Sequence, residues 1–152
     1  MSTRKGNLLI IDDEKLIVER VSMLLEDLAD EVFTAYDGVE GFEVFQENNI
    51  DCIICDIKMP RLNGVELIKK IREVNKEVPF IFYTGHGSKE LMMEVVKYGA
   101  FDFLDKPNLD HLEEVVERGL KLGVKGTSDL KDSSDFISEY QDMMKEFDED
   151  DS

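Results

Sequence analysis

The chain has 152 residues, of which 42% are hydrophobic and 9% aromatic, and its formal net charge is −17. This length and composition fit one folded domain, and the excess of acids argues against nucleic-acid binding, because phosphate backbones are held by clustered Lys and Arg. No apolar run reaches the roughly 20 residues that a membrane span requires, and residues 1–11 do not fit a secretory signal. We therefore expect a cytoplasmic protein with neither a membrane nor a nucleic-acid partner.

Short apolar runs alternate with amphipathic stretches, beginning near the N-terminus. Residues 8–11 form the first predicted strand, and apolar residues at helical spacing follow over residues 17–28. Residues 31–35 alternate in hydrophobicity, as in a strand at the edge of a sheet. Asp37, with an acid three positions later, is the expected cap of the next helix.

The middle of the chain repeats this alternation. Residues 52–55 are uninterrupted apolar sequence, which is typical of a strand covered by helices on both faces. Asn63 is expected to cap the following helix. Residues 80–83 form the fourth predicted strand, and Ser88 begins a helix whose inward residues are predicted to be Met92, Val95 and Val96.

The last predicted strand is residues 101–104, and Asn108 caps a helix that runs to Leu122. Gly123 and Gly126 are predicted to begin a linker. Five strand–helix units in a row predict an α/β fold, a doubly wound five-stranded parallel sheet with helices on both faces. The flavodoxin-like strand order 2-1-3-4-5 is the natural candidate for five such units.

The C-terminal part of the chain differs in composition. We assign residues 1–124 to the domain and residues 125–152 to an acidic tail, in which ten acids accompany three bases. Apolar residues at helical spacing favour an amphipathic helix over residues 133–147, docked on a partner or on the domain itself; the alternative is a disordered, solubilising tail. These apolar residues are Phe136, Tyr140, Met143, Met144 and Phe147.

Cys52 and Cys55 are the two cysteines of the chain, and both lie in the third predicted strand. Residues three apart on a strand point to opposite faces, so their sulfur atoms diverge. We interpret both as buried apolar thiols and not as a redox or zinc pair.

Polar residues follow four of the predicted strands. Asp12 and Asp13 follow the first, Asp56 the third, Thr84 the fourth and Lys106 the fifth. In the order 2-1-3-4-5 these side chains converge on one rim, where strand order reverses. Three carboxylates together require a cation, and their oxygens suit Mg²⁺. The amine of Lys106 and the hydroxyl of Thr84 add groups that can hold a phosphate.

Four segments carry a resemblance to a known family. The segments at 8–14 (LLIIDDE), 55–64 (CDIKMPRLNG), 83–87 (YTGHG) and 101–107 (FDFLDKP) resemble the response-regulator receiver domain of two-component signalling. The match covers roughly residues 7–122 with all five strand–helix units in register. It implies a phosphoprotein that a sensor histidine kinase or a histidine phosphotransfer protein phosphorylates on Asp56.

The resemblance also implies the metal ligands. Asp13, Asp56 and the backbone carbonyl of Lys58 would bind Mg²⁺, with Mn²⁺ as a substitute, and Asp12 would act through water. Lys106 would bind the phosphoryl group, and the Lys106–Pro107 peptide would be cis.

Further roles concern switching and the rate of dephosphorylation. Thr84 would donate its hydroxyl to the phosphoryl group, and Phe103 would be the aromatic that turns inward on activation. Lys58 and His86 are candidates for tuning the loss of the phosphoryl group; the alternative is that both are exposed loop residues.

These residues also allow other interpretations. Asp12, Asp13 and Glu14 could serve only to favour the start of a helix. A haloacid-dehalogenase-type phosphatase expects a second Asp two residues after the first, where this chain has Lys58. A flavodoxin-like electron carrier needs a Ser/Thr-rich phosphate loop after the first strand, where this chain has acids.

We therefore expect a switch that catalyses only its own phosphotransfer and dephosphorylation and is otherwise not an enzyme. About 30 residues after the domain are too few for an output domain. A stand-alone receiver is the prediction, one that signals by protein contacts through the surface of the fourth helix, the last strand and the last helix.

Overall fold

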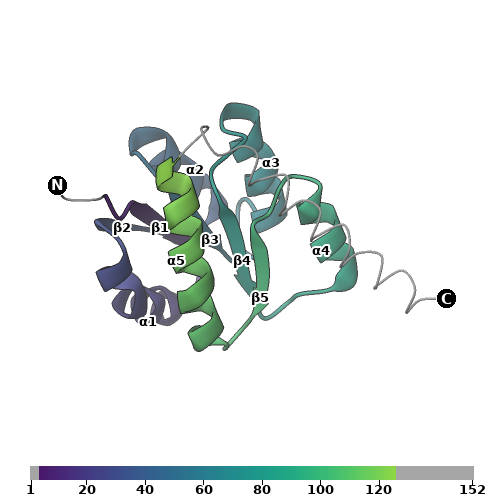
Figure 1. Cartoon of the computed structure of the whole chain (residues 1–152). Coiled ribbons are helices and arrows are strands. Elements are labelled where there is room, and N and C mark those ends of the chain that lie inside the picture. Colours follow the sequence, from purple (N-terminus) through teal and green to yellow (C-terminus); the bar gives the residue numbers. More distant parts are fainter. Residues whose placement is uncertain (1–3, 126–152) are drawn as a thin grey trace.

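The computed structural model describes residues 4–125, which form five strands and five α-helices in strict alternation. Figure 1 shows the helices arranged around a central twisted sheet. In chain order the elements are β1 (Asn7–Ile11), α1 (Lys15–Leu25), the short 3₁₀ turn η1 (Glu26–Leu28), β2 (Glu31–Ala35), α2 (Gly38–Glu47), β3 (Cys52–Cys55), α3 (Gly64–Val74), β4 (Phe80–Thr84), α4 (Lys89–Val96), β5 (Asp102–Asp105) and α5 (Leu109–Lys125).

The sheet is parallel throughout and has the strand order β2-β1-β3-β4-β5, as predicted. The central strand β1 pairs with β2 on one side and with β3 on the other, so that Ile11 lies opposite both Ala35 and Cys55. The chain order reverses between β1 and β3. In parallel α/β sheets this is the position where ligands bind, beyond the carboxyl ends of the strands.

Two hydrophobic cores cover the two faces of the sheet. Along β1, Leu8 and Ile10 point toward the core that α1 and α5 complete, whereas Leu9 and Ile11 point toward the core under α2, α3 and α4. This alternation follows from the period of two residues in a strand. Figure 1 shows α5 in front of the sheet and α2 and α3 behind it.

The two cysteines follow the same rule. Cys52 lies in the core under α1 and α5, Cys55 lies in the opposite core, and both are fully buried. Burial raises the pKa of both thiols, so they stay protonated. The prediction of separate buried apolar thiols is confirmed.

The predicted helix caps are present. The Asp37 side chain accepts a hydrogen bond from the Glu40 N–H at 2.8 Å, and the Ser88 hydroxyl accepts one from Leu91. Asn63 and Glu66 form a reciprocal capping box. The caps fix where α2, α3 and α4 begin.

α4 is less buried than its sequence suggests. Only Val95 of this eight-residue helix is fully buried, whereas Met92 and Val96, which were predicted to face inward, are half-buried and are not among the described residues that pack against either core. The prediction was wrong for these two residues because α4 lies near the β5 edge of the sheet, where less strand surface is available to cover them. Within residues 4–125, no helix is long and apolar enough to cross a membrane.

α5 continues past Leu122 to Lys125, so the linker predicted at Gly123 is helix. A Cβ atom at Gly123 would collide with the backbone carbonyl of Asp51, just before β3. Glycine is needed there because the helix lies directly against the backbone. The predicted tail, residues 125–152, lies outside the described residues except for Lys125. The helix predicted over residues 133–147 lies outside them entirely.

Replacing Gly123 with Ala is expected to lower the free energy of unfolding by about 1–3 kcal/mol, because the added methyl meets backbone that cannot rotate away. At an ordinary glycine in a helix, the same change raises the free energy of unfolding by about 1 kcal/mol. A decrease at Gly123 would therefore indicate the close approach to the backbone. Urea unfolding measures it. Gly85→Ala is the control, since a Cβ at Gly85 has nothing within 4 Å. A Gly123→Ala protein more stable than wild type would contradict the close approach.

Candidate phosphoryl-transfer and metal site

The carboxyl ends of β1, β3, β4 and β5 bring the predicted site residues together. The sheet hydrogen bonds continue beyond the strands: Asp12 donates its N–H to Ala35 at 3.1 Å, and Asp56 donates to Ile11 at 3.0 Å. Lys106 donates its backbone N–H to the carbonyl of Thr84 at 3.0 Å. The backbone that carries Asp12, Asp56 and Lys106 is therefore held as firmly as the sheet itself.

The Lys106 ammonium lies between two carboxylates. Its Nζ is 2.7 Å from Asp12 Oδ2 and 3.0 Å from Asp56 Oδ2, and the more exposed Glu14 carboxylate is 4.0 Å away. Burial alone would lower the pKa of Lys106, but the hydrogen bonds and charges of Asp12 and Asp56 outweigh it and raise that pKa. Lys106 is therefore a fixed positive charge. The Lys106–Pro107 peptide is cis.

Four acids cluster beside the ammonium. One carboxylate oxygen each from Asp12, Asp13, Glu14 and Asp56 lies within 4.8 Å of the others. Oxygen ligands at this spacing suit Mg²⁺, which binds through one or two carboxylates and keeps several waters. The arrangement can hold a hard divalent cation beside a positively charged amine.

The four acids differ in how much of their bonding capacity the protein already uses. Asp12 is buried, and its two oxygens accept hydrogen bonds from Lys106 Nζ and from the Glu14 N–H. Asp56 is also buried and accepts from Lys106 and from the Ile57 N–H at 2.7 Å. Asp13 is exposed, and within residues 4–125 its carboxylate has no hydrogen-bond or ion-pair partner. Asp13 has the most capacity left for a cation.

Asp12 carries the clearest electrostatic strain of the site. Burial raises its pKa above the usual 3.8, and the nearby Asp56 charge adds to this, while the hydrogen bonds from Lys106 and Glu14 act in the opposite direction. The net direction is upward. A cation bound beside these acids would relieve the repulsion.

Thr84 is the last residue of β4 and is fully buried. Its Oγ1 accepts a hydrogen bond from the His86 N–H at 3.1 Å. Because the hydroxyl accepts this bond, its own hydrogen remains available for donation to another oxygen. Thr84 thus connects the site to the loop between β4 and α4.

A shallow hollow opens the site to solvent. Lys58 and His86 are both exposed and both line it, on the β3–α3 and β4–α4 loops. Both alternatives therefore hold. Lys58 and His86 line the hollow beside Asp56, and both are exposed loop residues. The complete lining is Asp13, Glu14, Asp56, Lys58, Met59, Pro60 and His86.

Three lining residues were not predicted as part of the site, namely Glu14, Met59 and Pro60. Glu14 had a signal in the sequence, since it continues the acidic run of Asp12 and Asp13, but it was interpreted only as a helix-start residue. Met59 and Pro60 carry no charge or ligand atom that would have indicated them.

Phe103 lies on β5 at the side of the site that faces α4. Its ring is half-buried, packs against Phe82 with the ring centroids 5.8 Å apart, and lies so close to Gly87 that a Cβ there would be 2.8 Å from it. The ring of Phe103 therefore lies against the loop that precedes α4.

Comparison with known proteins identifies relatives of the whole described region. Residues 8–117 match the family model of the response regulator receiver domain. The transcriptional regulatory protein FixJ of Bradyrhizobium diazoefficiens is 32% identical over 121 residues, which are 78% of this chain and 58% of FixJ. The chain spans less than two thirds of the length of the first curated relatives that it matches.

Solved structures agree with this match. A response regulator receiver domain protein from Clostridium thermocellum is 34% identical, with a TM-score of 0.70 over 76% of this chain and 94% of that one. A CheX–CheY–BeF₃–Mg²⁺ complex from Borrelia burgdorferi is 26% identical, with a TM-score of 0.70 over 74% of this chain and 87% of that one.

Mg²⁺ is expected to stabilise the protein, because it offsets the repulsion among the four acids. At about ten times the Kd, the free energy of unfolding should rise by about 1.4 kcal/mol. Asp13→Asn should remove most of this gain, whereas Asp27→Asn, in the 3₁₀ turn η1 and outside the acid cluster, should keep it. Thermal unfolding with and without Mg²⁺ measures the difference, and an Asp13→Asn protein that responds like wild type would exclude Asp13 as a ligand.

The raised pKa of Asp12 predicts a pH effect in the metal-free protein. Since the folded-state pKa lies above the unfolded one, the folded state takes up the proton first as the pH falls. The free energy of unfolding of wild type, relative to Asp12→Asn, should therefore increase as the pH falls through the folded-state pKa. Urea unfolding of both proteins with a chelator present tests this. A difference that decreases on acidification would mean that Lys106 outweighs burial at Asp12.

Proposed function

Because this chain belongs to the response regulator receiver domain family, whose members are phospho-aspartate signalling switches, we propose that Asp56 is the residue that accepts the phosphoryl group. The observation that carries this assignment is the position of Asp56. Its carboxylate lies 3.0 Å from the Lys106 ammonium, within the four-acid cluster, and lines the hollow open to solvent.

The proposed reaction transfers a phosphoryl group from a phosphohistidine. An Asp56 carboxylate oxygen attacks phosphorus, the P–N bond breaks, and its electron pair leaves with the imidazole nitrogen, giving an acyl phosphate on Asp56. Negative charge is spread over the equatorial phosphoryl oxygens in the transition state, so positioning and electrostatic stabilisation are the main contributions of the protein. The bonds from Ile57 and Lys106 hold the Asp56 carboxylate ready in one orientation.

Receiver domains bind Mg²⁺ at an acidic pocket, and the donor set of this chain fits that ion. Asp13, Asp56 and the Lys58 carbonyl are the proposed direct ligands, with Asp12 acting through water, as the resemblance to the family implies. When bound, Mg²⁺ supplies positive charge that offsets the negative charge of the phosphoryl oxygens. Mn²⁺ as a substitute stays a prediction.

Lys106 and Thr84 are the proposed partners of the attached phosphoryl group. The ammonium of Lys106 is already within 3.0 Å of Asp56, and the Thr84 hydroxyl has a hydrogen to donate. If Thr84 moves to make this bond, the His86 N–H bond changes and the loop beside Phe103 changes with it. Phosphorylation thereby shifts an equilibrium between two arrangements of the loop, Phe103 and α4.

The proposed partners are a sensor histidine kinase or a histidine phosphotransfer protein as donor, and a downstream protein at the surface of α4, β5 and α5. α4 suits a switching element because Val95 is its only fully buried residue, with Leu91 partly buried against the same core. Lys58 and His86 are the proposed tuning residues, since both line the hollow. The stand-alone arrangement, the cytoplasmic location and the absence of a nucleic-acid partner stay predictions.

Asp56→Asn is expected to abolish phosphorylation, because the amide cannot act as the nucleophile. Incubation of the full chain with radiolabelled acetyl phosphate and Mg²⁺, followed by measurement of protein-bound label, tests this. The matched control is Asp27→Asn, an exposed residue outside the acid cluster, which should incorporate label at the wild-type rate. Label at the wild-type rate in Asp56→Asn would show that another residue is the acceptor.

A further inference from the structure

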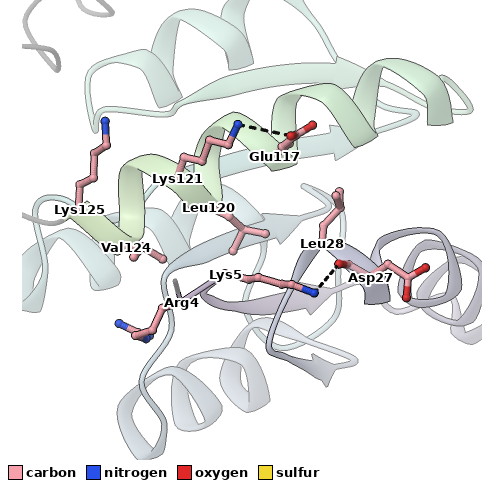
Figure 2. A pocket seen from close by; sticks show the side chains of 9 residues that line it. All are labelled: Arg4, Lys5, Asp27, Leu28, Glu117, Leu120, Lys121, Val124 and Lys125. Atoms are coloured by element: carbon pink, nitrogen blue, oxygen red, sulfur yellow. Dashed lines mark hydrogen bonds and ion pairs between the residues drawn. The ribbon is translucent and has the colours of Figure 1, made fainter. Parts of the chain in front are cut away.

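A second concave surface lies away from the acidic site. It is bounded by the C-terminal half of α5, by the residues that precede β1, and by η1 (Figure 2), and it holds a cavity of about 510 Å³. This size is within the range of pockets that bind ligands or side chains of a partner. We call it the α5 groove; its lining residues are Arg4, Lys5, Asp27, Leu28, Glu117, Leu120, Lys121, Val124 and Lys125.

The floor of the α5 groove is apolar. Leu28, Leu120 and Val124 supply it, and Leu28 and Val124 are only half-buried. Val124 is held against the start of the sheet, since a Cβ at Gly6 would be 2.7 Å from its methyl group. The α5 groove is therefore a fixed feature of the fold, with apolar surface that remains partly open to water.

The rim of the α5 groove is basic. Arg4, Lys5, Lys121 and Lys125 are four of its nine lining residues, whereas Asp27 and Glu117 are its only acids. Arg4 is already paired with Asp51, 2.8 Å away, but four bases against three acids still leave a local excess of positive charge in a chain of net charge −17. Lys121 is 3.4 Å from Glu117, and Lys5 Nζ contacts the backbone carbonyl of Asp27, as Figure 2 shows. These contacts orient the lysines along the edges of the apolar floor.

The chain itself contains a segment of opposite charge that begins at this groove. Lys125 ends α5 and lines the α5 groove, and the 27 residues that follow it contain ten acids and two lysines. The segment also contains the apolar residues Phe136, Tyr140, Met143, Met144 and Phe147.

The length of the chain permits contact in the same molecule. The α5 residues that line the α5 groove, from Glu117 to Lys125, span about 12 Å of helix. The ten residues 126–135 can reach about 33 Å when extended, and Gly126 allows the chain to reverse. A short tether of this kind gives an effective concentration in the millimolar range, so weak contacts suffice.

We propose that the α5 groove binds the acidic segment 126–152 of the same chain. The apolar side chains between Phe136 and Phe147 cover Leu28, Leu120 and Val124, while the acids beside them meet the basic rim. Exposed ion pairs contribute little individually, so the apolar contact and the tether supply most of the affinity. This inference does not depend on the phosphorylation site.

A nitroxide label tests the proposal in the full chain. Cys52 and Cys55 are fully buried, so a thiol-reactive label attaches to an engineered cysteine in Ser138→Cys without their removal. In a ¹⁵N-labelled protein the label should broaden the amide signals of Leu28, Leu120 and Val124 more than those of the β4–α4 loop. Equal broadening over the whole surface, or the strongest broadening elsewhere, would overturn the proposal.

The charge contribution is tested by reversing two lysines on the rim. Lys5→Glu with Lys121→Glu should remove the selective broadening, whereas the matched control, Lys76→Glu with Lys97→Glu, should keep it, because both of these lysines are exposed and outside the α5 groove. Unchanged selective broadening in the rim variant would contradict charge complementarity. Tyr140→Ser with Phe136→Ser tests the same contact from the side of the segment and should also abolish the broadening.

A second copy of the chain is the alternative occupant. Mixing ¹⁵N-labelled protein without a nitroxide with unlabelled protein that carries it separates the two cases. The proposal predicts no selective broadening in the mixture. Broadening at the α5 groove in the mixture would mean that the segment binds between molecules, and would overturn the proposal of contact within one chain.

Discussion

The ion pairs of Lys106 with Asp12 and Asp56 are the interaction on which the site depends. A partly buried ammonium at 2.7 and 3.0 Å from two buried carboxylates joins the ends of β1, β3 and β5. Removal of one partner would leave uncompensated buried charge, which is costly. Even with Lys106 in place, four acids face one amine, so the site retains an excess of negative charge that favours a cation. The proposed chemistry follows from this imbalance.

The parallel sheet explains how residues far apart in sequence reach the same point. Asp12 and Lys106 are 94 residues apart, and their side chains meet because every strand of the sheet ends at the same edge. The reversal of strand order between β1 and β3 leaves a hollow beyond their ends. The fold thereby creates the hollow, and the strand-end residues determine its chemistry. The α5 groove lies near the opposite, amino-terminal ends of β1 and β2, with basic residues around an apolar floor.

Most of the fold could be predicted because the buried strands are unmistakable in sequence. Residues 8–11 and 52–55 are continuous apolar runs, and each is followed directly by aspartate, which locates both the strand and its end. Close approaches and edges could not be predicted. Gly123 resembles a linker residue until the nearby Asp51 carbonyl is known, and the exposure of Met92 depends on how far the sheet extends beneath α4. Glu14 was missed because one charge in an acidic run has no distinguishing mark before the fold is known.

The central claim is that Asp56 carries the phosphoryl group, and the most direct measurement is chemical trapping of the acyl phosphate. Borohydride reduces an acyl phosphate to the alcohol, which leaves a change of mass at the modified residue that tandem mass spectrometry locates. After treatment of the full chain with acetyl phosphate and Mg²⁺, the account predicts the reduced residue at position 56 alone. A reduced residue at position 12 or 13, or none anywhere, would contradict it.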